Sequence, residues 1–307
     1  MDADIFQNLP TTEVAKLVRA AGPKVCVFPI NGTRRWFVLE HPPQPGEDAM
    51  LAYLDIAGKR HVELYQLLFD HGLDTLLTPV FGPDLLERGE TYLKAAANGM
   101  ARLATHPDFT DFYRAYGVRV RFYGDYRRFF AGTPYAFLSD LFDEATAQTM
   151  THNRCRLFIG VCANDAAETL VRLSIGYHAE HGQAPDKRAL VELYYGEYVP
   201  PVDLFIGFDK FCTFDMPLVA NGNEDLYFTV SPSPYLAARQ LRAILYDHLY
   251  TRRVEEPDYA TLPPEDWALM REFYRANREK TQGVGVLRDD IWYPLPQVEF
   301  PDGFAED

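Results

Sequence analysis

Short, almost continuous apolar runs alternate along the chain with longer stretches in which apolar residues recur every three or four positions. The runs are rich in β-branched and aromatic residues, which favour strands, whereas the longer stretches have the spacing of helices. Such an alternation is typical of a parallel sheet covered by helices on both faces. The six runs predicted as strands lie at residues 25–28, 73–81, 118–123, 155–162, 202–208 and 225–230.

The helical stretches begin with a lead-in helix over residues 1–22, and a broken helical pattern covers 47–71, where Gly58 is a potential interruption. Residues 255–307 are expected to form a helical and irregular C-terminal extension. Further helices are predicted at 84–105, 107–116, 166–180, 186–197, 235–253 and 264–280, with a looser helical region before residue 150. Because no linker or repeat divides the chain, we expect one α/β domain over 1–307 with a six-stranded, mainly parallel sheet.

Composition and charge narrow the classes of function. The chain has 307 residues and 47% of them are apolar, so it can bury a sizeable core and is not disordered as a whole. Its formal net charge of −14 argues against a nucleic-acid-binding surface, because phosphate backbones bind clustered cations. A small anionic substrate needs only a local group of Arg side chains and is not excluded.

The cysteines, histidines and N-terminus predict a cytoplasmic protein without a transmembrane segment. The N-terminus is acidic, and no run approaches the roughly 20 apolar residues of a membrane span. No cysteine pair has the C-x-x-C spacing, and the eight scattered His argue against a His-based metal site. We interpret the four cysteines as buried free thiols of a reducing compartment: Cys26, Cys155, Cys162 and Cys212.

The first candidate for chemistry is the turn that follows the first predicted strand. Asn31 and Gly32 form a turn dipeptide, and Thr33, Arg34 and Arg35 come directly after it. A strand that leads into a turn with a hydroxyl, free amides and two guanidiniums could bind a phosphate group. It could equally be a strand-to-helix corner with two solvated Arg side chains, and the spacing alone leaves both interpretations open.

Other polar residues follow the remaining predicted strands. Ligands of open α/β sheets bind outside the carboxyl ends of the strands, so these residues are expected at the same edge as the turn. Together with two Arg pairs, acids and amides there could hold a diphosphate with a Mg²⁺ ion. The signatures of phosphate-loop and dinucleotide-binding proteins are absent from the sequence. The secondary candidates are Asp125, Asn164, Asp165 and Asp209.

The stretch over residues 28–36 resembles the D-G-N-x-R-W signature of the cis-prenyltransferases. Similar segments follow in the family's order at 123–126, 164–168, 203–206 and 225–229. A closer resemblance, from about Pro23 to Trp292, is to the tuberculosinyl adenosine transferase branch, also called tuberculosinol or isotuberculosinol synthases. That resemblance rests on the segments at 22–25, 84–89, 194–199 and 244–248.

The resemblance implies a substrate, a metal and an assembly. The substrate would be an allylic prenyl diphosphate, in this branch a bicyclic diterpenyl diphosphate, with adenosine as one acceptor. Mg²⁺ would be the cofactor, with Asn31 and Asp225 as the candidate ligands, and the protein would be a homodimer. The diphosphate-binding residues would be Gly32, Thr33, Arg34 and Arg35, and the catalytic residues would be Asn31, Tyr53, Arg34 and Arg35.

Tyr53 falls where the branch has a tyrosine near the reacting carbon. The resemblance therefore implies that Tyr53 could orient a nucleophile or take a proton. A half-buried helix tyrosine without a role in the reaction is an equally good interpretation of the same residue.

Two positions depart from the family pattern. Gly207 stands where chain-elongating members have the Arg that holds isopentenyl diphosphate, so the cation should meet water, lose a proton or alkylate an acceptor such as adenosine. Asn31 stands where the family has an Asp that helps to hold Mg²⁺, and an amide oxygen lacks that charge. Weakened metal dependence, replacement by another carboxylate and an inactivating substitution all fit this change.

Three functions follow. The first is a terpenoid enzyme that ionises a prenyl diphosphate and passes the cation to water, giving a diterpene alcohol, or to a nucleoside. The second is a catalytically weakened subunit that binds a prenyl diphosphate, which Asn31 favours. The third, a chain-elongating cis-prenyltransferase, is disfavoured by Gly207.

Overall fold

The computed structural model describes residues 1–22, 24–42, 46, 48–82, 89–163, 166–213, 216–252, 261–295 and 299–300. Among these residues, no helix has both the length and the apolar character needed to cross a membrane.

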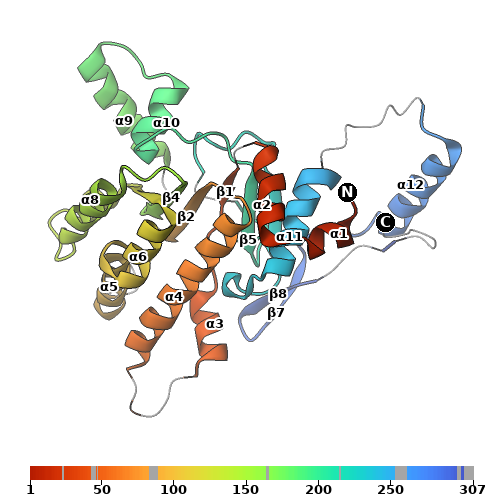
Figure 1. Cartoon of the computed structure of the whole chain (residues 1–307), viewed down its shortest axis with the longest axis horizontal. Coiled ribbons are helices and arrows are strands. Elements are labelled where there is room, and N and C mark those ends of the chain that lie inside the picture. Colours follow the sequence, from red (N-terminus) through yellow and green to blue (C-terminus); the bar gives the residue numbers. More distant parts are fainter. Residues whose placement is uncertain are drawn as a thin grey trace.

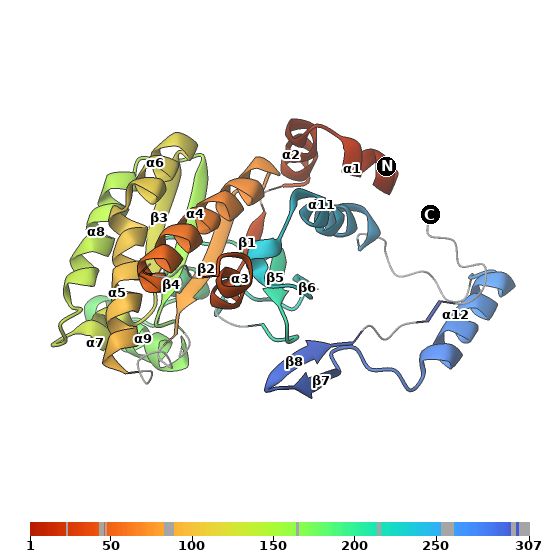
Figure 2. The ribbon, with the colours of Figure 1, turned by 90° about the horizontal axis from the view of Figure 1, so that it is seen from below.

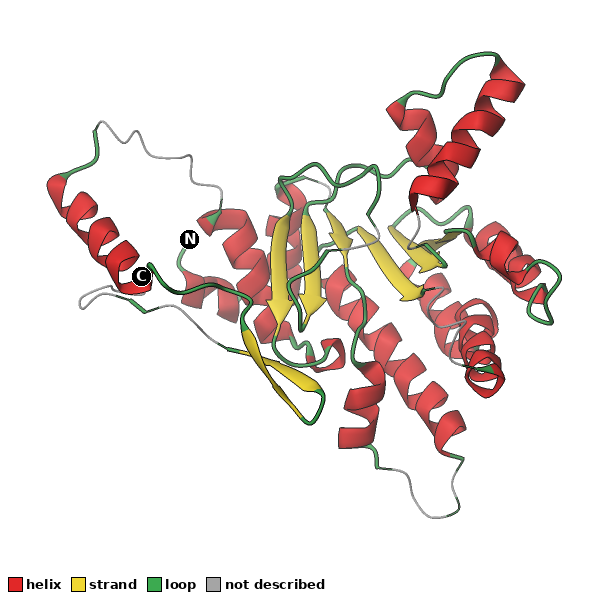
Figure 3. Ribbon diagram, turned by 180° about the vertical axis from the view of Figure 1, so that it is seen from behind, coloured by secondary structure: helices red, strands yellow, loops and turns green. Residues whose placement is uncertain are grey.

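A six-stranded sheet runs through the centre of the molecule (Figure 3), in the order β3-β4-β2-β1-β5-β6. Each neighbouring pair is parallel, which confirms the predicted sheet and the α/β fold class. Four of the strands, β1, β2, β4 and β5, have the nearly continuous burial that the apolar runs predicted, whereas the two edge strands, β3 and β6, are only partly buried. The strands are β1 (Val25–Val27), β2 (Thr75–Phe81), β3 (Val118–Tyr123), β4 (Cys155–Val161), β5 (Leu204–Phe208) and β6 (Asp225–Thr229).

Helices cover both faces of the sheet (Figure 1), and alternate strand residues supply two separate cores. The helices before β4 are α1 (Ala3–Asn8), α2 (Thr11–Ala20), α3 (Thr33–Glu40), α4 (Ala49–Asp70), α5 (Glu90–Thr105), α6 (Pro107–Tyr116), α7 (Tyr126–Phe130) and α8 (Phe137–Thr149). Cys26 and Leu76 point to the larger core, which α4, α5, α6 and α8 complete, whereas Val27 and Leu77 join the side chains of α10 (Lys187–Tyr195).

Two of the later helices, α9 (Ala166–His181) and α12 (Pro264–Asn277), bury no residue. Helix α9 projects away from the sheet (Figure 1), whereas α10 buries Val191, Tyr194 and Tyr195 against it. Helix α12 lies apart from the sheet (Figure 2). After β6 come a 3₁₀ turn, η2 (Ser233–Tyr235), then α11 (Ala238–Tyr246) and a π-helical turn, η3 (Asp247–Thr251).

Several predicted elements need correction. The lead-in helix is two helices, because Pro10 cannot continue the first, whose start is capped by Asp2. Helix α4 is not interrupted at Gly58, where an added Cβ atom would lie 3.5 Å from a ring carbon of Phe109. The tail is not irregular throughout, since β7 (Gly285–Arg288) and β8 (Ile291–Pro294) pair as an antiparallel hairpin.

One of the four cysteines differs from expectation. Cys26, Cys155 and Cys162 are buried free thiols, whereas Cys212 is exposed. Cys212 follows the end of β5 in the loop, so it is not covered by the helices that bury the strand cysteines.

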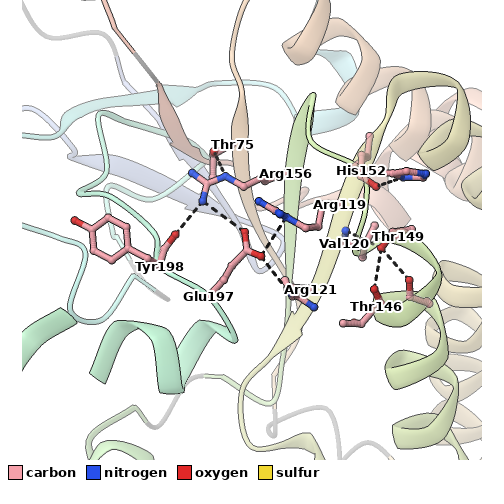
Figure 4. A network of polar contacts seen from close by, with 12 residues as sticks. Thr75, Arg119, Val120, Arg121, Thr146, Thr149, His152, Arg156, Glu197 and Tyr198 are labelled. Atoms are coloured by element: carbon pink, nitrogen blue, oxygen red, sulfur yellow. Dashed lines mark hydrogen bonds and ion pairs between the residues drawn. The ribbon is translucent and has the colours of Figure 1, made fainter. Parts of the chain in front are cut away.

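A group of charged residues joins the end of α10 to β3 and β4 (Figure 4). Glu197 lies just after α10, and one of its carboxylate oxygens is 3.1 Å from the Nε atoms of both Arg119 and Arg121 on β3. Arg156 on β4 approaches the same carboxylate at 3.6 Å and donates to the carbonyl of Tyr198 at 2.9 Å. Three guanidiniums therefore share one carboxylate whose side chain is 17% exposed.

Glu197→Gln should destabilise the fold, because it leaves three partly buried guanidiniums without their shared anion. We expect the free energy of unfolding, measured by urea denaturation, to fall by about 2 kcal/mol. The matched control is Glu192→Gln on α10, whose exposed pair with Arg188 contributes about 0.5 kcal/mol or less. Equal losses in the two variants would contradict the assigned role of Glu197.

Candidate active site

The turn after β1 contains a glycine with a left-handed backbone. Gly32 has φ 75°, and a Cβ atom at this position would lie 2.8 Å from Cβ of Pro232 and 2.9 Å from Cε1 of Phe208. Both the backbone conformation and the close packing exclude a side chain here. Gly32 thereby joins the end of β1 to the end of β5 and to the loop after β6.

Ser233 fastens the same turn from a distant part of the chain. Its hydroxyl accepts a hydrogen bond from the Asn31 amide at 3.1 Å and donates one to the Pro29 carbonyl at 3.2 Å. Its own amide donates to the Asn31 carbonyl at 3.0 Å. Ser233 was not among the candidates from the sequence, because its pairing across some two hundred residues leaves no local signal beyond a Pro-rich turn.

Helix α3 begins at this turn, and within the described residues no side chain caps its N-terminus. The amides of its first turn have no intrahelical partners, and such amides favour an anion. Thr33 is buried and its hydroxyl donates to the Ile30 carbonyl at 3.1 Å, so that proton is engaged and its amide is the group left for a ligand. Arg34 and Arg35 are exposed, and the Arg35 guanidinium lies 5.6 Å from the centre of the Phe208 ring.

An apolar cavity of about 480 Å³ adjoins the turn, and Arg34 belongs to its lining. This volume is within the usual range for a small-molecule site. The cavity lies between α3, α4 and α5, and the end of β2 contributes to it. Pro79 offers no amide hydrogen to β4, and the register shifts there so that Val80 is unpaired. Lining residues from these elements include Phe37, Leu54, Ala57, Val80, Phe81 and Met100.

Tyr53 lies on α4 in the cavity lining, and its ring meets that of Phe37 edge-on at 5.3 Å. Burial raises the pKa of the Tyr53 hydroxyl above its ordinary value, nearby Tyr92 raises it further, and Arg34 lowers it. The phenol is therefore protonated at neutral pH and acts as a hydrogen-bond donor. Tyr92 on α5 also lines the cavity and was missed, because nothing in its local sequence distinguishes it from a surface helix residue.

The secondary candidates fall into different places. Asp125 follows β3, and its carboxylate is occupied by Arg172 at 2.7 Å and Arg128 at 3.3 Å. Asp209 comes directly after Phe208, which packs on Gly32, so it lies at the same edge as the turn. Asn164 and Asp165 lie outside the described residues.

Asp225 does not join Asn31, so the expected pairing of these two metal ligands needs correction. It opens β6 and pairs in register with Leu204 at the start of β5, whereas the turn lies beyond the opposite ends of the strands. Its carboxylate is 2.6 Å from Nδ1 of His248 and 3.6 Å from Arg252. Within the described part of the chain, no group of three or more His, Cys, Asp or Glu could hold a metal.

Two solved structures share the architecture just described. Lavandulyl diphosphate synthase from Lavandula x intermedia, in complex with dimethylallyl diphosphate, matches with a TM-score of 0.57 and 15% identity over 78% of this chain and 97% of that chain. A probable undecaprenyl diphosphate synthase from Campylobacter jejuni matches with a TM-score of 0.53 and 14% identity over 76% and 97%. The fold is that of the cis-prenyltransferases.

Sequence comparison narrows the class. Tuberculosinyl adenosine transferase from Mycobacterium tuberculosis (strain CDC 1551 / Oshkosh) is 43% identical over 290 residues, 94% of this chain and 96% of that protein. (+)-Kolavelool synthase from Herpetosiphon aurantiacus is 23% identical over 292 residues, 94% of each protein. No protein-family model matches the chain. The chain belongs to the tuberculosinyl adenosine transferase branch of the cis-prenyltransferase superfamily, and it is an enzyme that acts on a prenyl diphosphate.

Gly32→Ala tests the turn. Since the new methyl group would overlap Pro232 and Phe208, we expect a roughly 100-fold loss in the rate of diphosphate release, measured with geranylgeranyl diphosphate. The control is Gly22→Ala, which has φ 100° but no atom within 4 Å of the new Cβ. It should lose about 1 kcal/mol of stability and keep its rate. A fully active Gly32→Ala enzyme would remove the turn from the site.

Proposed function

We propose that the chain ionises an allylic prenyl diphosphate, in particular a bicyclic diterpenyl diphosphate, and passes the cation to water or to a nucleoside such as adenosine. One observation carries this proposal. Arg34 belongs both to the anion-binding turn and to the lining of the apolar cavity. A substrate with a charged head and a long hydrocarbon fits that junction.

The turn would bind the diphosphate and stabilise it as a leaving group. The Thr33 amide at the start of α3 and the guanidiniums of Arg34 and Arg35 would donate to its oxygens. When the bond between the allylic carbon and the diphosphate oxygen breaks, the electron pair stays on the oxygen. Donors already in place stabilise that developing negative charge without having to reorganise.

The cavity would receive the allylic cation. The rings of Phe37, Tyr53 and Phe81 lie in its lining, and aromatic faces attract cations. Tyr53 would orient the acceptor with its neutral hydroxyl. Attack by water forms a carbon–oxygen bond and releases a proton to solvent or diphosphate, whereas attack by an adenosine nitrogen gives a diterpenyl nucleoside. The names of the two relatives, an adenosine transferase and a kolavelool synthase, support both outcomes.

Chain elongation is not supported. Gly207 is buried in β5, and a Cβ atom there would lie 2.8 Å from the ring of Phe205 and 2.9 Å from that of Phe228. The position has no room for the Arg that would hold isopentenyl diphosphate.

Mg²⁺ would bind chiefly through the substrate. Mg²⁺ at phosphate sites is commonly held by one or two carboxylates together with phosphate oxygens and water. Asn31 in the turn carries an amide oxygen, and Asp209 supplies a carboxylate at the same edge of the sheet. This donor set fits an ion that the protein holds weakly, and the ion would neutralise part of the diphosphate charge when bound.

The catalytically weakened binding subunit is the alternative, and Asn31 is the residue that favours it. Both curated relatives bear the names of enzymes, which supports the catalytic interpretation. The homodimer stays a prediction from the resemblance, which light scattering of the purified protein would test.

Arg34→Ala should abolish turnover and leave the fold intact, because Arg34 is exposed. We expect the rate of diphosphate release from geranylgeranyl and halimadienyl diphosphates to fall roughly 100-fold or more, with adenosine present and absent and products identified by mass spectrometry. Arg114→Ala on α6, which removes an exposed guanidinium far from the turn, should keep full activity. If the unaltered protein released diphosphate from neither substrate, the proposed enzymatic function would be wrong.

Asn31→Asp should strengthen Mg²⁺ binding, since it restores a negative charge beside the diphosphate. We expect the Mg²⁺ concentration that gives half-maximal activity to fall roughly tenfold. Asp209→Asn should move it in the opposite direction, and Asn tolerates the left-handed backbone at this position, where φ is 70°. An unchanged Mg²⁺ dependence in both variants would remove these residues from the metal site.

A further inference from the structure

The polar side chains on the cavity lining are engaged to different degrees. Arg34 and Tyr53 lie at the end beside the turn, where the diphosphate is proposed to bind. Arg102 is paired with Asp55, and its Nη2 atom lies 3.0 Å from Nε2 of His106. These groups have evident partners or tasks.

His61 has neither. Tyr53, Ala57 and His61 recur at intervals of four residues, so they share one face of α4, and all three line the cavity. The Nε2 atom of His61 is buried without a hydrogen-bond partner, and no described residue hydrogen-bonds its other ring nitrogen. The neighbouring Tyr65 ring is 6.4 Å away, and its hydroxyl is already paired with Thr78 at 3.3 Å.

His61 is half-buried, and its Nε2 atom is the ring nitrogen cut off from solvent. A buried nitrogen without a partner is costly, because it has lost its hydrogen bond to water and gained none in return. An apolar side chain would fill the same position without that cost. Burial lowers the pKa of His61 to about 4, so the ring is neutral at pH 7 and carries one donor and one acceptor nitrogen. A hydroxyl group, which both donates and accepts, complements either nitrogen.

The position of His61 along α4 separates it from the reacting carbon. Eight residues of helix place it about 12 Å from Tyr53 along the axis. A proton-transferring group has to lie roughly 3 Å from the atom it serves. His61 is therefore suited to binding the distal part of the hydrocarbon and not to the ionisation or the capture of the cation.

We propose that His61 recognises a hydroxyl group on the hydrocarbon of the substrate, remote from the diphosphate, so that the preferred substrate is an oxygenated prenyl diphosphate. The inference rests on the proposed function, since it assumes that the diphosphate lies at Arg34. It makes His61 a specificity-determining residue. An oxygenating reaction on the prenyl skeleton would then have to precede this enzyme.

The test uses two thiolodiphosphate analogues, in which sulfur replaces the bridging oxygen and prevents turnover. One carries the geranylgeranyl chain, and the other carries the same chain with a hydroxyl group on its terminal isoprene unit. Dissociation constants for the full-length protein, for His61→Leu and for His61→Gln are measured by calorimetry. The control Met100→Leu changes another cavity residue without changing polarity.

We expect the unaltered protein to bind the hydroxylated analogue roughly tenfold more tightly than the plain one. His61→Leu should reverse this preference, His61→Gln should keep part of it, and Met100→Leu should leave the ratio unchanged. Equal affinities in the unaltered protein, binding of neither analogue, or a ratio unaffected by His61→Leu would overturn the proposal. Diphosphate release from the matching oxygen diphosphates is measured separately, so a hydroxyl preference without turnover would refute the proposed function and leave the role of His61 standing.

Discussion

The left-handed backbone of Gly32, packed beneath Pro232 and Phe208, is the constraint on which the site depends. It lets the chain leave β1 and enter α3 without a side chain between two other segments. Ser233 then fastens the turn with three hydrogen bonds. These contacts fix the start of α3 and the backbone positions of Arg34 and Arg35, so the geometry of the proposed anion site is set by the backbone before any charged side chain contributes.

The charges around the cavity are compatible with the proposed formation of a cation in it. Burial raises the pKa of the Tyr53 hydroxyl and lowers the pKa of the His61 imidazole, so both side chains are neutral at pH 7. The Arg102 guanidinium is balanced by Asp55. Among the described residues no ion pair neutralises Arg34 or Arg35, so positive charge is concentrated at the turn where we propose that the diphosphate binds. The local arrangement makes an anion site possible in a chain whose formal net charge is −14.

The two faces of the sheet are stabilised in different ways. On one face, α4, α5 and α6 form the larger core and leave the cavity open beside α3. The other face is covered more sparsely, and α9 buries no residue. There the connection from α10 to β5 relies on Glu197 and its three guanidiniums. Polar contacts replace part of the packing that a fuller helical layer would supply.

Much of the fold was determined by the sequence by itself, because strand burial and helix periodicity are local patterns that survive in any context. The continuous apolar runs located all six strands, and the Asn31–Arg35 stretch identified the turn. A local sequence pattern does not contain the distances between residues that are far apart in the chain. Only the tertiary structure separated Asp225 from Asn31, engaged the Thr33 hydroxyl, brought Ser233 to the turn and opened a cavity lined by Tyr92 and His61. These contacts depend on which side chains come together once the sheet and its helices have packed. The local sequence around each residue carries no information about them.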